Sequence, residues 1–214
     1  MADRATAGEI ADRPRLELYW IPLGAGAQVV RLSGRAYEAL TAVLQQRPRR
    51  DLYHSALIAT TAAGRTIVES APVPDGEGPH RRGVVAEGAV GSSWLGRLRV
   101  FRYEVRRWPG GLIPDLRYAV ASPVRLTEDP LAVAQVLELV AEAPSPVWGR
   151  DELHAGEMWN SNSLIAWVLA RAGLLVPAGQ PPPNGRAPGW DAGIHVAGRL
   201  VAPPATRTTV SAVL

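Results

Sequence analysis

The stretch MWNSNSLIAWVLARAGL, residues 158–174, joins four small polar residues to an apolar run that predicts a helix. The polar residues are Asn160, Ser161, Asn162 and Ser163. Gly173 closes the run, as glycine commonly does just past the last residue of a helix. Serine and asparagine here can cap the helix, or a serine can be presented as a nucleophile at the helix's positive end. The sequence leaves both interpretations open.

The composition limits the class of protein. The chain has 214 residues, 47% of them hydrophobic, which is enough for one domain with a sizeable core. All 23 basic residues are arginine, yet the formal net charge is only +3. Because no stretch concentrates arginine with aromatic residues, we do not expect a nucleic-acid partner. The absence of cysteine excludes disulfides, thiolate metal sites and a cysteine nucleophile.

The sequence favours a cytoplasmic protein without a membrane span. The N-terminus is charged and lacks the apolar core of a secretory signal. The longest apolar run, Leu164 to Val176, is interrupted by Arg171 and is too short for a bilayer. No cofactor or metal is expected, because the four histidines show no metal-ligand spacing. These histidines are His54, His80, His154 and His195. The oligomeric state is left open.

Strand patterns dominate the first two thirds of the chain. Aromatic and apolar residues at 16–23 predict a strand. The stretches 52–60 and 65–72 are joined by the short turn TAAG and predict a β-hairpin. Further strands are expected at 83–88, 98–108 and 117–124.

Three helices are expected. The first covers 33–47, with Ser33 as its cap, and the second covers 129–143, with Asp129 as its cap. The third is the stretch at 158–174. These elements predict an α+β fold, an antiparallel sheet of about five or six strands packed with three principal helices.

The domain organisation follows from the positions of proline and glycine. We expect a flexible leader at 1–14 and a single α+β domain at 15–175. Proline and glycine dominate the start of the remaining segment, 176–214. This composition predicts an irregular arm wrapped on the domain.

Two glycine-containing stretches match active-site motifs incompletely. GAGAQVV follows the first strand, but the third glycine of a dinucleotide-binding fingerprint would fall on Val29. GSSWLG has Leu95 where a nucleophile elbow built around Ser93 needs glycine. Neither stretch is interpreted as functional.

A possible catalytic set combines Ser161 with His54 and Glu69. A serine hydroxyl needs a base at neutral pH, and His54 lies at the start of an apolar strand. Glu69 lies on the neighbouring predicted strand, where a carboxylate could orient the imidazole. Each residue also has an ordinary structural role available. Ser161 could be a helix cap, His54 a hydrogen-bonded histidine and Glu69 a solvent-facing strand residue.

The neighbours of Ser161 would complete such a site. Backbone N–H groups near Asn162 and Ser163 could bind an oxyanion, and the Asn160 side chain could add a donor. If the site is catalytic, the His54 ring and the Ser161 hydroxyl should face one cleft within about 5 Å, with Glu69 in hydrogen-bond reach of His54.

The order of these features resembles that of the circularly permuted papain-like proteins. This group includes lecithin:retinol acyltransferase and permuted relatives of bacterial cell-wall amidases. In that family a strand opens with histidine, as in LYHSAL, and a late helix opens with asparagine and cysteine. Ser161 stands at the cysteine position, and Glu69 maps onto the second polar residue. The chain looks closest to uncharacterised bacterial members with an Asn-Ser-Asn motif, and the resemblance covers about residues 50 to 175.

The resemblance implies a permuted papain-like fold and activity as a hydrolase, such as an amidase, or as an acyltransferase. Serine in place of cysteine removes the thiolate–imidazolium chemistry of the family. Either Ser161 works with His54, or the site has lost catalysis and kept a pocket.

Tryptophans surround the motif. Trp148 and Trp159 flank the segment before the predicted helix, and core packing is their simplest role. An aromatic-walled cleft is the alternative, with Arg150 as an anion-binding residue and Arg186 closing the cleft from the C-terminal arm.

The leading hypothesis is a serine-dependent hydrolase or acyltransferase acting on an amide, ester or acyl-linked substrate. The alternative is a catalytically inactive papain-like binding or scaffold protein that recognises a small molecule, a peptide or an acyl group in the same cleft. A third hypothesis is an assembly subunit whose tryptophans form an interface.

Overall fold

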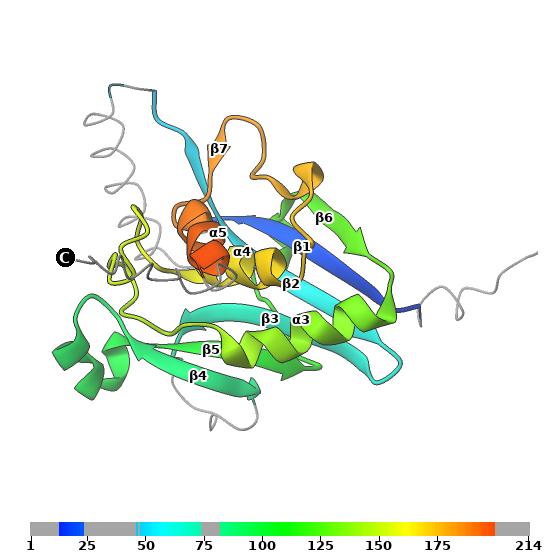
Figure 1. Cartoon of the computed structure of the whole chain (residues 1–214), viewed down its shortest axis with the longest axis horizontal. Coiled ribbons are helices and arrows are strands. Elements are labelled where there is room, and N and C mark those ends of the chain that lie inside the picture. The colour runs from blue at the N-terminus through cyan, green and yellow to red at the C-terminus, as the bar shows by residue number, and fades with distance from the viewer. Residues whose placement is uncertain (1–12, 24–45, 47, 74–81, 200–214) are drawn as a thin grey trace, which may run out of the picture.

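A computed structural model describes residues 13–23, 46, 48–73 and 82–199 (Figure 1). The predicted helix at 33–47 falls, except for Gln46, outside these residues, and so does His80.

The fold is α+β, as predicted, and is built on an antiparallel sheet with the strand order β4-β5-β3-β2-β1-β6. The strands are β1 (Arg15–Pro22), β2 (Asp51–Thr61), β3 (Gly64–Pro72), β4 (Val84–Ala89), β5 (Arg102–Pro109) and β6 (Val120–Thr127). A two-residue strand, β7 (Gly185–Arg186), pairs with β2 in parallel.

The predicted hairpin is confirmed. Strands β2 and β3 pair in antiparallel register from Leu57↔Val68 to Thr61↔Gly64, so the turn consists of two alanines. Gly64 has a φ of +107°, a conformation that side chains with a Cβ rarely adopt. This register fixes which residues of each strand share a face of the sheet.

The strand predicted at 98–108 begins later, at Arg102, and residues 117–119 precede β6. The short 3-10 helices η3 (Arg99–Phe101) and η4 (Leu116–Tyr118) take up most of these positions, and a further one, η2 (Ser93–Arg97), precedes η3. Ladder pairing between β4 and β5 ends at Ala89↔Arg102, and from Ser92 to Phe101 the backbone N–H groups that bond do so to carbonyl oxygens two or three residues earlier.

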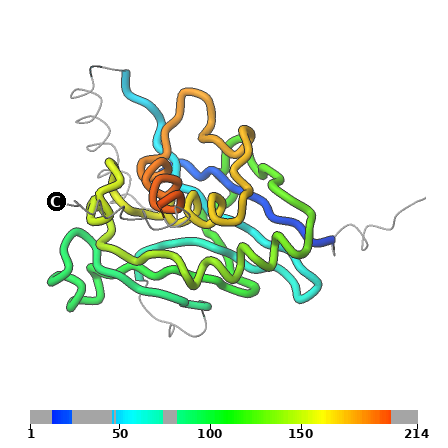
Figure 2. Tube along the Cα trace, viewed as in Figure 1, coloured from blue at the N-terminus to red at the C-terminus, as the bar shows by residue number. Residues whose placement is uncertain are grey.

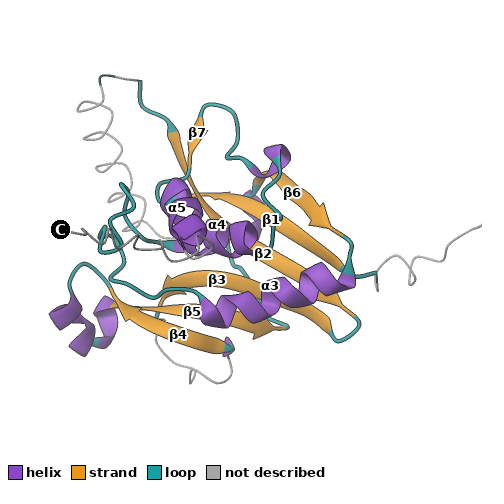
Figure 3. Ribbon diagram, viewed as in Figure 1, coloured by secondary structure: helices purple, strands orange, loops and turns teal. Residues whose placement is uncertain are grey.

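Three described α-helices lie on one face of the sheet (Figure 3). They are α3 (Pro130–Glu142), α4 (Ser161–Arg171) and α5 (Trp190–Arg199). The predicted cap of α3 is confirmed, because the Asp129 carboxylate accepts a hydrogen bond from the Leu131 N–H at 2.9 Å. Gly173 follows α4 with a φ of +69°, as expected for a glycine that ends a helix.

Helix α5 corrects the prediction of an irregular arm. The segment after α4 contains the short helix η5 (Pro177–Gly179) and β7, and then residues 190–199 form a helix that packs on α4. Its buried side chains include Trp190 and Val196. A Cβ on Gly193 would lie 2.2 Å from the Ser163 carbonyl oxygen, so glycine permits this close approach. The prolines ahead of this helix obscured its periodicity.

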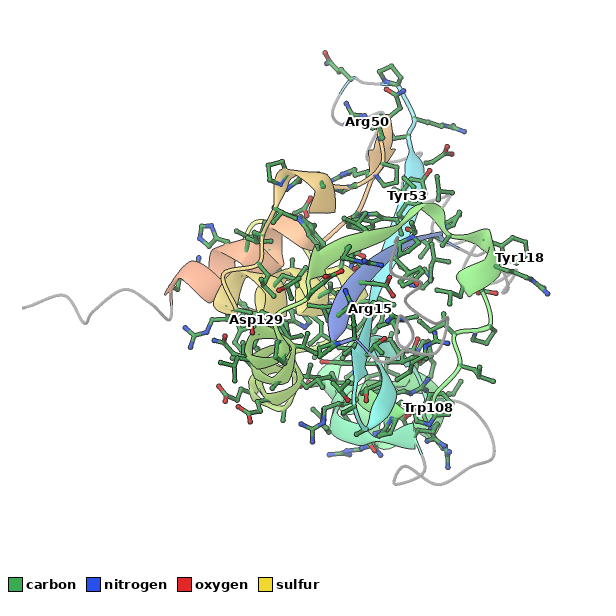
Figure 4. All side chains as sticks on the ribbon, turned by 90° about the vertical axis from the view of Figure 1, so that its right-hand side faces the viewer. Arg15, Arg50, Tyr53, Trp108, Tyr118 and Asp129 are labelled. Atoms are coloured by element: carbon green, nitrogen blue, oxygen red, sulfur yellow. The ribbon has the colours of Figure 1, made fainter. Side chains whose placement is uncertain are left out.

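The sheet separates two apolar clusters. The larger cluster lies under the helices and joins Leu57 and Val68 to α4 residues such as Ile165. The smaller cluster lies on the opposite face, and its buried residues are Ile21, Ala56, Ile58, Ile67 and Ile113. Figure 2 traces the helices across the first face. Figure 4 shows the sheet from its side, with Asp129 and the helices on one side and Tyr118 and Trp108 on the other.

Candidate functional site

The start of α4 is held by a capping box. Asn160 is the cap residue, and its Oδ1 accepts hydrogen bonds from the N–H groups of Asn162 at 2.8 Å and Ser163 at 3.4 Å. In return, the Ser163 Oγ accepts from the Asn160 N–H at 3.1 Å. Two of the four small polar residues therefore satisfy the exposed N–H groups of the first turn. The capping role proposed for Ser161 belongs to Asn160.

Asn162 joins α4 to two other segments. Its Nδ2 donates to the carbonyl oxygens of Tyr53 and Pro188, both at 3.0 Å. Its Oδ1 accepts from the Ser55 hydroxyl at 2.9 Å. The side chain is thus fully engaged, with β2 on one side and the approach to α5 on the other. We call Asn162 and Ser55 the polar brace.

Ser161 stands apart from this network. It is the first residue of α4, and it is 6% exposed. Its hydroxyl makes no hydrogen bond with any residue that the structure describes. It lies at the positive end of the helix, where an anion or a developing negative charge would be stabilised.

His54 does not face Ser161, and the predicted Ser161–His54 pair is wrong. Side chains alternate between the faces of a strand, and Ser55 points to α4 through the brace. His54 therefore points to the opposite face. There it is directly opposite Ile21 of β1, a member of the smaller cluster. The whole sheet lies between the imidazole and the Ser161 hydroxyl.

The surroundings of His54 keep its ring neutral. Burial lowers its pKa to about 4, and the opposing attraction of the Asp115 carboxylate only partly offsets this effect. Asp115 belongs to the loop between β5 and β6, whose residue Ile113 also packs in the smaller cluster. This electrostatic partner provides separate support for the placement of His54.

Glu69 shares that face but binds arginine. Its Oε1 accepts from Arg106 at 2.9 Å, and Arg106 in turn pairs with Glu104 at 2.9 Å. Glu104 also pairs with Arg82 at 2.6 Å. We call Glu69, Arg106, Glu104 and Arg82 the buried ionic network. The predicted hydrogen bond between the His54 ring and the Glu69 carboxylate is not among the contacts of the described residues.

Burial and the neighbouring arginines act in opposite directions on the carboxyl pKa values of this network. Burial raises the pKa of Glu69, with Arg106 opposing it. Burial also raises the pKa of Glu104, but the hydrogen bonds and charges of Arg82 and Arg106 outweigh it and bring this pKa below its ordinary value. The two arginines thus favour the charged form of Glu104, which pairs with both of them.

The residues proposed for an aromatic-walled cleft make structural contacts. Trp159 is 3% exposed within the main core, and the half-buried Trp148 packs edge-on against Tyr103, with ring centroids 5.1 Å apart. The Arg150 Nε donates to the Gly91 carbonyl oxygen at 2.6 Å. The simpler account of these residues as packing and anchoring groups fits the structure.

Arg186 also has a structural partner. It pairs with Glu157 at 2.7 Å, and the second oxygen of Glu157 accepts from the Gly189 N–H at 2.8 Å. This contact holds the segment before α5 against the segment before α4. Arg186 was predicted to close a cleft from the C-terminal arm; in the structure its Nη2 is directed to Glu157, in the segment before α4.

A charged hollow of about 190 Å³ was not anticipated from the sequence. It is lined by Val73, Arg82, Glu87, Arg99, Arg102 and Glu104. Within it, Arg102 pairs with Glu87 and Arg82 pairs with Glu104, so these charges are neutralised locally. The alternation of charge at 102–106 could have indicated a charged strand face but not the hollow.

No protein-family model, curated protein or solved structure matches the chain. In the part of the chain that the structure describes, no three His, Asp or Glu side chains come together as a metal-binding group. No helix among the described residues combines the length and the apolar character needed to cross a bilayer.

Proposed function

We propose that the protein is a non-catalytic binding or scaffold protein. The observation that carries this proposal is the pairing of Ser55 with Asn162, which directs His54 away from Ser161. A serine without a base is a poor nucleophile at neutral pH. The polar residues that open α4 then have a stabilising role, and the helix holds β2 and the C-terminal segment together.

Two further contacts support this proposal. Glu69 is engaged by Arg106 and so does not orient an imidazole. The other described histidines, His154 and His195, are both exposed. The ligand class that the papain-like resemblance implies, a peptide or acyl group, stays a prediction, as does the papain-like relationship.

One observation favours a second candidate, a serine-dependent hydrolase or acyltransferase. Ser161 occupies the first position of α4, and its neighbours do the capping, so its hydroxyl has no structural partner among the described residues. Such an enzyme would need a base other than His54.

Labelling with a fluorophosphonate probe separates these candidates. The parent, Ser161→Ala and His54→Gln proteins are treated under native conditions beside an active serine hydrolase, and modification is located by peptide mass spectrometry. No labelling of Ser161 is expected. Labelling that survives His54→Gln would favour the second candidate. Labelling lost in His54→Gln would overturn the proposal and support a Ser161–His54 pair.

The binding role needs a positive result as well. We expect an acylated or amidated peptide from a diverse panel to raise the Tm of the parent protein, because a ligand that binds only the folded state stabilises it. If no member of the panel does so, the third hypothesis, an assembly subunit, becomes the better account.

A further inference from the structure

The connection between β4 and β5 presents apolar side chains to solvent. We call residues 90–101 the β4–β5 protrusion; Figure 1 shows it as the green turns beyond the ends of these strands, away from the three helices. Of the nine large hydrophobic residues exposed in the described part of the chain, four belong to it. These are Trp94 at 65% exposure, Leu98 at 54%, Val100 at 76% and Phe101 at 37%.

The protrusion is a folded element. At its base, the Val90 N–H donates to the Phe101 carbonyl oxygen at 2.8 Å, and the Gly91 N–H donates to that of Trp148 at 2.9 Å. Its two 3-10 turns are closed by backbone hydrogen bonds. A Cβ on Gly96 would lie 2.8 Å from the Ala89 Cβ, so glycine lets the turn pack on β4. The exposed side chains are therefore displayed on a fixed support.

The charge of the protrusion has one sign. The protrusion, residues 90–101, contains no aspartate or glutamate and carries two arginines. Arg97 and Arg99 are exposed, and Arg102 pairs with Glu87 of β4. Tryptophan beside arginine is typical of elements that lie at a membrane interface, where the indole enters the headgroup region and the guanidinium groups meet lipid phosphates.

We propose that the β4–β5 protrusion docks on an anionic lipid surface, with Trp94, Leu98 and Val100 entering the interface. A protein partner would need a concave surface that fits the protrusion, whereas a lipid interface accepts a projecting apolar element of any shape. The positive charge selects anionic lipid. This inference goes beyond the proposed function and does not depend on whether Ser161 reacts.

Vesicle sedimentation with the full chain tests the proposal. The probes are vesicles of phosphatidylcholine alone and of equal parts phosphatidylcholine and phosphatidylglycerol. The parent protein should pellet with the anionic vesicles, pellet less as salt is raised, and stay in solution with phosphatidylcholine alone. The Trp94→Ser/Leu98→Ser variant should bind the anionic vesicles at least about fivefold more weakly, because apolar side chains supply part of interfacial binding.

The chain offers a matched control. Leu112 and Leu131 are 76% and 78% exposed but lie outside the protrusion. The Leu112→Ser/Leu131→Ser variant should bind anionic vesicles as the parent does, and circular dichroism should show that both double variants remain folded. An equal loss of vesicle binding in this control would overturn the proposal. So would a parent protein that does not bind anionic vesicles. If Trp94→Ser/Leu98→Ser instead changes only self-association of the free protein, the protrusion is a protein interface and the lipid proposal is wrong.

Discussion

Buried polar residues are satisfied differently on the two faces of the sheet at β2 and β3. On the helix face, Ser55 is 0% exposed and pairs with Asn162, so a short hydroxyl and an amide satisfy each other without charge. On the other face, His54 is kept neutral, and Glu69 of β3 enters a network of four charged groups. The helix face thus buries a neutral polar pair, whereas the other face buries a neutral imidazole and charges that need partners.

The difference shows that the position of a residue along a strand determines which face its side chain lies on, and so which groups it can contact. Because the side-chain period of a strand is two residues, a shift of one residue moves a group to the other side of the sheet. His54 and Ser55 are adjacent in sequence, yet the first is influenced by the charge of Asp115 and the second donates a hydrogen bond to Asn162. The same alternation places His54 and Glu69 on the face of the sheet opposite α4, so neither is directed toward Ser161 at the start of that helix.

The largest effect is expected from the charged face. Glu104→Ala removes the carboxylate shared by Arg82 and Arg106 and leaves buried positive charge with less compensation, which should reduce the free energy of unfolding by about 3–5 kcal/mol. Urea denaturation measures this loss. Glu87→Ala is the matched control, because its pair with Arg102 is partly exposed and should contribute less than about 1 kcal/mol. Similar losses of stability in the two variants would show that the buried ionic network contributes no more than the partly exposed pair of Glu87 and Arg102.

A smaller loss is expected from the neutral face. Asn162→Ala removes the hydrogen bonds to Tyr53 and Pro188 and leaves the Ser55 hydroxyl buried without an acceptor, so stability should fall by about 2–3 kcal/mol. Ser161→Ala, one residue away, should change stability by less than about 0.5 kcal/mol, because this hydroxyl has no hydrogen-bond partner among the described residues. Equal effects in urea denaturation would mean that Ser161 has a structural role that its contacts do not reveal.

The smallest effect concerns pH and His54. The folded state holds the His54 pKa near 4, below the ordinary value of 6.5, so the unfolded chain binds this proton first as pH falls. Its contribution to stability is therefore present above about pH 6.5 and is lost between about pH 6.5 and pH 4. The size should be about 2 kcal/mol, a value discounted because the residue as a whole is half-buried.

His54→Gln should flatten that part of the stability profile, measured as urea midpoints between about pH 7 and pH 4. His195→Gln serves as the control, since this histidine is exposed on α5. If the parent and His54→Gln profiles are parallel, the ring is not held neutral by burial and His54 must reach solvent.

Sequence patterns alone determined much of this protein, because local signals are read from neighbouring residues. The alternation of β2 and β3 with a short turn predicted their hairpin, and Asp129 before Pro130 predicted the start of α3. The polar run before Leu164 located the start of α4, although the cap is Asn160 and not Ser161. These features depend on contacts within a few residues, which the sequence displays directly.

Only the tertiary structure decided which side chains meet. Whether His54 or Ser55 faces α4 depends on the sheet's orientation toward the helices, and apolar residues on both faces of β2 conceal that choice. Helix α5 was hidden behind prolines, because its burial comes from packing on α4 through Gly193. The partner of Glu69 was equally hidden, since Arg106 lies 37 residues away and reaches it only through the pairing of β3 with β5. Contacts between residues far apart in the sequence leave no local pattern. The sequence therefore could not show which side chains come together at the start of α4, and the tertiary structure was needed to show it.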